Sequence, residues 1–366
     1  MEDRAVAFLR RLLDAPGPSG YESAPARVWR DEAATFADEV THDVVGSSFA
    51  RVNSRQDATD APKVLLAGHI DEIGFVITHI DKEGVLWFAP LGGWDDQVVV
   101  GQRLRIAGRD GDVIGVIGKK AAHLLKEDDR RRPTRLDEMW IDIGADDYDD
   151  AARRVAIGDA AVIDSQFVEL SGDICVSRSM DNRVGAFVAL EAARLVAVDR
   201  GAVDVYAVAT AQEEITFGGA YTASFSVAPM VAIAIDVTHA TDYPGADKKR
   251  NHEVKLGGGP VLSRGATIND GVFNGLRDAA RILGIETAVQ ASGKSSGTDA
   301  DAMIHSGAGT ATGVVSIPNR YMHSPNELVS LSDLENASKI IAGFVQTLNA
   351  DSDFRPGSTQ ARTAVS

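Results

Sequence analysis

The sequence predicts an α/β fold with a mainly parallel, mixed sheet flanked by helices and interrupted by an inserted β-rich segment. Short apolar runs of strand type alternate with helical apolar spacing in the first and last parts of the chain. Between about Gly74 and Gly172 the pattern changes to many glycines and short alternating stretches. At 366 residues, the chain also exceeds the usual size of one core.

These patterns predict a discontinuous domain organisation. We expect one α/β domain to comprise residues 1–73 and 173–350, with residues 74–172 inserted as a separate β-rich domain. Residues 351–366 are polar and contain Pro and Gly, so we expect a disordered tail. No internal repeat is evident.

The first elements follow from local patterns. An amphipathic helix ends before Pro16, and the charges spread through it argue against a signal peptide. Val64–Ile70 is a short apolar run of strand type. In the inserted segment, Arg103–Ile106 and Asp112–Gly118 alternate as strands do, whereas the charged run Lys126–Arg132 predicts a solvated loop.

Strand and helix patterns alternate again after Cys175. The predicted elements are, in order, a helix at Asn182–Val198, strands at Val203–Ala209 and Val231–Ile235, a helix at Phe273–Leu283, a strand at Thr312–Ile317 and a helix at Leu331–Leu348. We expect Ser332 to cap the last helix, because Glu335 follows three residues later.

Composition narrows the function classes. The 37 basic and 53 acidic residues give a net charge of −16, which argues against nucleic acid or an anionic membrane as a partner. No apolar run approaches the roughly 20 residues needed to span a bilayer. A single cysteine, Cys175, excludes an intramolecular disulfide and suits a reducing compartment. We therefore expect a cytoplasmic protein.

Polar residues gather after predicted strands at five places. These are Gly68–Glu72, Met180–Arg183, Gln212–Glu214, Asp236–His239 and Tyr321–Pro325. Sites in open α/β sheets form beyond the C-terminal strand edge, so segments distant in sequence can converge there. Two histidines with several carboxylates suit zinc, cobalt or manganese better than calcium.

The spacing of the first residues suggests roles around two cations. His69 and Asp71 are two apart, so on an extended segment both face the same side. Asp71 could then accept the free N–H of His69 while His69 binds a metal. Asp181 is expected at a helix start, where a carboxylate is favoured and could bridge two cations about 3.5–4 Å apart.

Glu213 and Glu214 are adjacent, so on an extended segment their side chains diverge. One could bind a metal while the other accepts a proton from a bound water, and the spacing leaves open which does which. Asp236 and His323 would complete a site with two nitrogen ligands and shared oxygens.

The sequence resembles the tetrahedral aminopeptidases, also called glutamyl-aminopeptidase-like or deblocking aminopeptidases, a family of co-catalytic di-metal exopeptidases. The matching motifs run in family order through almost the whole chain, and together they are highly specific. They are Ala15–Glu22, Gly68–Phe75, Met180–Gly185, Gln212–Glu214, Gly297–Ala300 and Arg320–Pro325. One departure is Thr216–Phe217, where family members usually have Gly and a small or β-branched residue, so the pocket entrance could differ.

The resemblance implies a role for each candidate residue. Asp181 would bridge two divalent metal ions, one also bound by His69 and Asp236 and the other by Glu214 and His323. Glu213 would be the general base, and Asp71 would support His69. Further implications are zinc or cobalt as the metal, with manganese as a third candidate, hydrolysis of N-terminal residues from short peptides, and a homododecamer built from dimers formed through the inserted domain.

Other functions stay open as alternatives. The same ligands could serve an N-acyl amino acid deacylase. A glycosidase is disfavoured because adjacent carboxylates do not flank a bond at a separation of about 5–9.5 Å. An inactive binding module is disfavoured because every ligand position is present.

Several other residues fit ordinary structural roles better than functional ones. We expect structural roles for five further histidines, which are His79, His123, His239, His252 and His305. His123 could alternatively reach a neighbouring subunit's site. Cys175 has apolar neighbours and is expected to be a buried thiol. Gly257–Pro260 lacks the pattern of a phosphate loop and is expected to be a turn.

Overall fold

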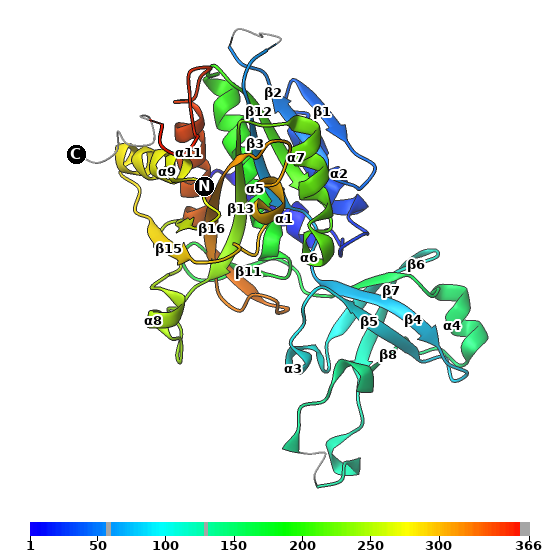
Figure 1. Cartoon of the computed structure of the whole chain (residues 1–366). Helices are drawn as coiled ribbons and strands as arrows, with labels where there is room; N and C mark the ends of the chain where they lie inside the picture. The colour runs from blue at the N-terminus through cyan, green and yellow to red at the C-terminus, as the bar shows by residue number, and fades with distance from the viewer. Residues whose placement is uncertain (56–59, 128–130, 359–366) are drawn as a thin grey trace.

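A computed structural model describes residues 1–55, 60–127 and 131–358. In these ranges a large mixed sheet is flanked by helices, and a closed six-stranded barrel lies beside it (Figure 1). The mixed α/β architecture expected from the sequence is confirmed. No helix in the described ranges is long and apolar enough to cross a membrane.

The large sheet has eight strands in the order β1-β2-β12-β3-β13-β16-β14-β15. Its strands are β1 (Glu39–His42), β2 (Ser48–Val52), β3 (Lys63–His69), β12 (Asp204–Thr210), β13 (Val231–His239), β14 (Val261–Gly265), β15 (Ala288–Ser292) and β16 (Ala311–Asn319). The four central strands, β12, β3, β13 and β16, are parallel, and β2 and β14 run antiparallel to their central neighbours. The central strands are buried on both faces, which explains their nearly continuous apolar sequences.

Helices pack against both faces of this sheet (Figure 1). One side carries α1 (Asp3–Asp14), α2 (Ser23–Ala33), α5 (Met180–Val198), α9 (Asp270–Leu283) and α11 (Leu331–Val345), and the other carries α7 (Gly218–Val227) and α10 (Ala300–Met303). The short helix α6 (Glu213–Thr216) precedes α7, and α8 (Lys248–Asn251) follows β13.

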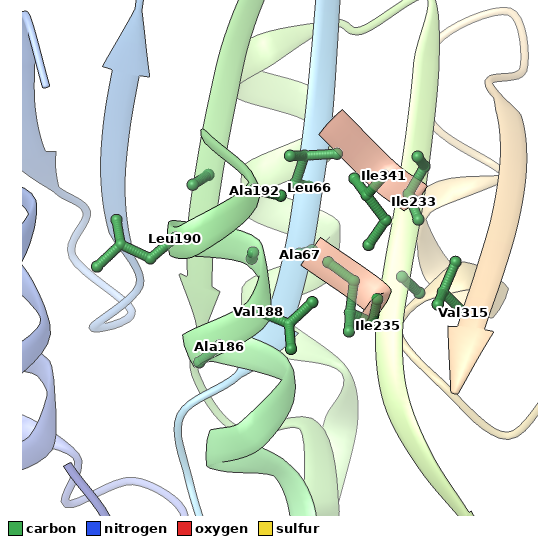
Figure 2. Packing of buried hydrophobic residues seen from close by; sticks show 14 of the residues in the cluster. Leu66, Ala67, Ala186, Val188, Leu190, Ala192, Ile233, Ile235, Val315 and Ile341 are labelled. Atoms are coloured by element: carbon green, nitrogen blue, oxygen red, sulfur yellow. The ribbon is translucent and has the colours of Figure 1, made fainter. Parts of the chain in front are cut away.

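Helix α5 lies across the centre of the sheet, where its apolar side chains meet those of β3 and β13 (Figure 2). A Cβ on Gly68 would lie 2.2 Å from the backbone carbon of Gly185, and a Cβ on Gly185 would lie 2.3 Å from the Ile235 carbonyl oxygen. The two glycines therefore allow the helix backbone to touch both strands. This close approach places the start of α5, including Asp181, at the C-terminal ends of the central strands.

The inserted segment forms a closed barrel in the order β4-β5-β8-β7-β6-β9. Its elements are β4 (Gly74–Ile80), β5 (Leu86–Leu91), α3 (Asp96–Val99), β6 (Arg103–Gly108), β7 (Gly111–Gly118), the 3-10 turns Ala122–Leu124 and Leu136–Glu138, β8 (Trp140–Asp142), α4 (Tyr148–Arg154) and β9 (Ala160–Ile163). The barrel has its own apolar core, separate from that of the large sheet. A third sheet consists of β10 (Val168–Glu169), β11 (Ile174–Ser177) and β17 (Glu327–Ser330).

The cap prediction for the last helix was wrong. Ser330 is the N-cap residue of α11, and Ser332 lies inside the helix, because the helix begins two residues earlier than a cap at Ser332 requires. Residues 351–358 contact the α/β core, where the Phe354 ring lies 6.4 Å from that of Phe344. Residues 359–366 of the expected tail, and residues 128–130 of the expected charged loop, lie outside the described residues.

Candidate metal centre

The seven site residues expected from the sequence come together at the C-terminal end of the central strands. His69 is the last residue of β3, and Asp236 lies two residues beyond Ala234, which pairs with Ala67. The register therefore places Asp236 level with His69 on the neighbouring strand. Asp71 follows β3, and Asp181 lies at the start of α5. Glu213 and Glu214 begin α6 after β12, and His323 lies in the loop before β17.

Asp181 lies at the centre of this cluster. Its Oδ1 is 3.2 Å from Nε2 of His69, and its Oδ2 is 3.2 Å from Nε2 of His323. On the first side, Asp236 Oδ1 is 3.9 Å from the same His69 nitrogen. On the second, Glu214 Oε1 is 3.5 Å from Nε2 of His323. The two carboxylate oxygens of Asp181 thus face two different sets of nitrogen and oxygen donors.

Three sets of side chains have donor atoms close enough for one ion, with all the atoms of a set within 4.8 Å of one another. These sets are His69, Asp181 and Asp236; Asp181, Glu214 and His323; and His69, Glu213 and Glu214. The first two share Asp181 and match the two ligand sets implied by the resemblance. The third shows that distance alone also admits Glu213 as a ligand.

The chemistry of these donors fits divalent cations. Imidazole nitrogens and carboxylate oxygens are the ligands that zinc, cobalt and manganese prefer. Oε1 of Glu214 is buried and forms no hydrogen bond within the described part of the chain, as expected for an atom that would contact a cation. Burial, together with the nearby carboxylates of Asp236 and Asp299, raises the pKa of Glu213 well above its usual value. A bound cation would reverse that preference and favour the charged carboxylate.

Asp71 connects the histidine to the glutamates. Its Oδ1 lies 3.4 Å from Nδ1 of His69, the ring nitrogen that faces away from Asp181. The backbone amides of Glu213 and Glu214 donate to its two oxygens at 3.2 Å. Burial alone would raise the pKa of Asp71, but the hydrogen bonds from His69, Ser19 and the Glu213 amide hold it below its usual value.

The backbone at the site differs from two expectations. Asp181 was expected to start a helix and does lie in the first turn of α5, but Asp181 and Asn182 have non-helical angles there. The Asp181 amide donates to Glu327 Oε2 at 2.9 Å, so a side chain helps to hold this segment. Glu213 and Glu214 were expected on an extended segment, but they begin a helical turn because Gln212 adopts a left-handed φ of 60°.

Sequence reasoning missed Glu327. This buried carboxylate accepts the Asp181 amide and, through Oε1, the His323 amide at 2.8 Å. It therefore holds the backbone of the central Asp181 and that of His323 on the second side of the cluster. Glu327 lies four residues after His323, and the only signal in the sequence was an acidic residue closely following the histidine motif.

A buried ionic network supports the segment after β3. Glu72 pairs with Arg178 at 2.6 Å and with Arg183 at 2.8 Å, and all three side chains are buried. Arg183 also donates to the carbonyl of Ile70, to that of Leu12 in α1 and to that of Gly17 in the loop after α1. Because charged groups require partners when buried, this network ties the loop at Ala15–Ser19 to the metal cluster.

The remaining expected structural residues lie outside the cluster, with one exception. Cys175 is fully buried on β11, and burial raises its pKa to about 12, so the thiol stays protonated. His123 is exposed in the barrel, and His305 lies in a turn after α10 rather than on a helix. His239 is the exception, because it lies at the exposed edge of the cavity that contains the metal cluster.

This cavity has a volume of about 420 Å³. The six direct ligand and base candidates, namely His69, Asp181, Glu213, Glu214, Asp236 and His323, all line it, and we call this part its floor. The walls come from β13, β14, β15 and the loop before α10. The arrangement could hold two cations beside a space large enough for part of a peptide.

Comparisons with known proteins show which family the chain resembles in sequence and structure. The chain is 34% identical over 352 residues to a lysyl aminopeptidase of Pyrococcus furiosus, covering 95% of this chain and 99% of that protein. Its structure resembles that of a TET aminopeptidase from a marine-sediment Thaumarchaeota archaeon, with a TM-score of 0.89, 34% identity and coverage of 95% and 98%. A Pyrococcus horikoshii TET1 peptidase, described as assembling into a tetrahedron or a large octahedral shell, matches with a TM-score of 0.82, 30% identity and coverage of 94% and 100%. The model of the M42 glutamyl aminopeptidases matches residues 46–340, and the chain therefore belongs to that family.

Proposed function

We propose that this aminopeptidase depends on two divalent metal ions and removes single residues from the N-termini of short peptides. The observation that carries the proposal is the position of Asp181, whose two oxygens face His69 and His323 in separate donor sets. His69, Asp181 and Asp236 would hold one ion, and Asp181, Glu214 and His323 the other. Zinc or cobalt fits these ligands best, and manganese is the third candidate.

The two cations, when bound, would lower the pKa of a water molecule and polarise the scissile carbonyl. Glu213 is the general base of the proposed reaction. Its Oε2 lies 3.6 Å from Nε2 of His69, beside both ligand sets, where it can accept a proton from the attacking water and pass it to the leaving amine. Asp71 holds the His69 ring from its other nitrogen and is a positioning residue.

None of the residues described in the inserted barrel is a candidate ligand. We propose that residues 74–172 form a dimerisation domain, that residues 1–73 and 173–350 form the catalytic domain, and that dimers assemble into a closed dodecamer. The separate apolar core of the barrel supports an independent folding unit. The tetrahedral assembly described for the P. horikoshii relative supports the closed arrangement.

Activity assays with matched substrates test the proposed chemistry. The chain, freed of metal and reloaded with zinc, cobalt or manganese, should cleave aminoacyl-anilides with a free α-amine. N-acetyl amino acids should remain intact. Cleavage of only the N-acetyl compounds would instead indicate a deacylase, and equal activity with and without a chelator would contradict the metal dependence.

A further inference from the structure

The walls of the cavity beyond the metal cluster differ in chemistry from its floor. Thr238 lies two residues after Asp236 on β13, so both side chains point to the same face of the strand. The strand rises about 3.3 Å per residue, which places Thr238 roughly 6–7 Å from Asp236. The side chain of a residue whose scissile carbonyl lay at the cluster would extend over that distance.

Thr238 holds Gln290 in a defined orientation. Its hydroxyl donates to Oε1 of Gln290, on β15, at 2.9 Å. With the amide oriented so that its oxygen accepts from Thr238, its two N–H donors can be offered to a ligand. Ser263 and Ser292 add neutral hydroxyl groups to the same walls, and Ile268 and Met322 add apolar surface.

Charge is confined to the floor and one edge of the cavity. Among the described residues that line it, the ionisable side chains are those of the metal cluster and His239, which is exposed. The wall residues are neutral. A lysine ammonium or a glutamate carboxylate placed against them would lose part of its hydration without gaining a counter-charge, which is unfavourable. A neutral side chain avoids that cost.

We propose that this cavity selects peptides whose N-terminal residue has an uncharged, medium-sized side chain, such as leucine, methionine or glutamine. Gln290, held by Thr238, is the specificity-determining residue. The proposal rests on the aminopeptidase function argued above and adds its substrate class. A neutral amide donor discriminates against a cation by placing N–H groups where a carboxylate would be needed, and it offers an anion no full positive charge.

Aminoacyl-4-nitroanilides of leucine, methionine, glutamine, lysine and glutamate test this directly. We expect kcat/KM for the three neutral substrates to exceed that for lysine and glutamate by about 10-fold or more. Gln290→Glu should raise the lysine-to-leucine ratio of kcat/KM by about 10-fold, because it places a carboxylate in the same volume. Gln346→Glu is the matched control, since Gln346 lies at the end of α11 and bonds to the Asp199 carbonyl. It should leave the ratio unchanged.

A wild-type preference for lysine or glutamate would overturn the inference, and so would a lysine-to-leucine ratio that Gln290→Glu leaves unaltered. Lys294 is exposed and lies two residues after Ser292. The glutamate substrate therefore tests whether the ammonium group of Lys294 attracts an acidic side chain. Cleavage of no anilide would contradict the aminopeptidase function instead. Calorimetric titration of the metal-loaded chain with leucine, lysine and glutamate then tests the cavity by itself, and tighter binding of either charged amino acid would refute its selectivity.

Discussion

The hydroxyl of Ser19 donates a hydrogen bond of 2.6 Å to Oδ2 of Asp71, and both side chains are buried. Ser19 belongs to the loop between α1 and α2, so this bond joins the N-terminal part of the chain to the metal cluster. Asp71 accepts from this hydroxyl and from two backbone amides while it faces His69. A group that only accepts hydrogen bonds is therefore required at this position.

Replacing Asp71 with asparagine should weaken metal binding and activity by about 10-fold to 100-fold. The NH2 group of Asp71→Asn must face other donors, either the Glu213 amide beside His69, or the Ser19 hydroxyl and the Glu214 amide. Ser19→Ala removes one hydrogen bond and should cost less. Metal affinity measured by competition with a chelator compares the two variants, and an Asp71→Asn affinity equal to that of the wild type would contradict the positioning role.

Glu213→Gln should retain both metal ions but lose turnover by about 100-fold to 10,000-fold, because the amide cannot accept the proton of the attacking water. Glu214→Gln is the matched comparison, since a ligand position should lose metal as well as activity. Elemental analysis and anilide hydrolysis on the same samples separate the two roles. Wild-type turnover by Glu213→Gln would contradict its role as the base, and loss of metal from it would show that the third donor set is the one in use.

The bridging role of Asp181 predicts an effect on metal stoichiometry. Asp181→Ala should hold fewer than two tightly bound ions per chain, since each proposed ion loses one of its ligands. Asp142→Asn, a change at an exposed barrel residue, is the control and should retain two. Circular dichroism establishes that both variants are folded. Two tightly held ions in Asp181→Ala would disprove the bridging role.

The convergence of the ligands could be predicted because strand ends determine it. His69 and Asp236 lie on adjacent parallel strands in matching register. An apolar strand pattern followed by a polar residue was therefore sufficient to predict that their side chains lie close together. Glu327 was not predictable in the same way. Its role is to accept backbone amides of Asp181 and His323, and a local sequence pattern does not indicate which backbone groups lie beside a given side chain.

The barrel shows a similar division between local and long-range information. The strand character of Arg103–Ile106 and Asp112–Gly118 is local and was predicted correctly, as β6 and β7 show. The pairing of β7 with β8 was not predictable, because more than twenty residues separate the two strands. Closure into a barrel depends on such non-local pairs, and apolar alternation alone specifies only the face of each strand.

The buried carboxyl group of Asp333 predicts how the stability of the fold depends on pH. Burial raises its pKa to about 6, although the amides of Gly257 and Gly259 donate to its oxygens and oppose the rise. The ordinary value is 3.8, so between roughly pH 4 and pH 6 the folded chain binds a proton that the unfolded chain does not. The contribution of Asp333 to stability therefore falls as the pH rises through this window.

Asp333→Asn removes this titration. The free energy of unfolding of the variant, relative to the wild type, should rise by on the order of 2 kcal/mol between pH 4 and pH 7. Urea denaturation at several pH values measures the difference, and other groups that titrate in both proteins cancel. A difference that stays constant over this range would contradict the raised pKa.

The outer surface of the barrel predicts how chains assemble. Ile114 and Val116 lie on the same face of β7, and their side chains are 51% and 45% exposed. The alternate residues of this strand face the barrel core, so β7 is apolar on both faces at this point. Adjacent exposed apolar residues on a strand are typical of a surface that another chain covers. A two-fold contact here would bring the same residues of two chains together.

Ile114→Glu should therefore disrupt the dimer, because it places like charges opposite each other across the two-fold axis. Val44→Glu is the control, since Val44 is fully exposed on the loop between β1 and β2, on the α/β domain. Light scattering of the metal-loaded wild type and the Val44→Glu control should give the mass of twelve 38.8 kDa chains. Ile114→Glu should give a much smaller species.

Enclosure would admit short peptides and exclude folded proteins, so the variant should also begin to degrade the exposed N-termini of larger substrates. A wild-type chain that remains a stable, fully active monomer at micromolar concentrations would refute the assembly, and the barrel would then be better explained as a cover over the substrate.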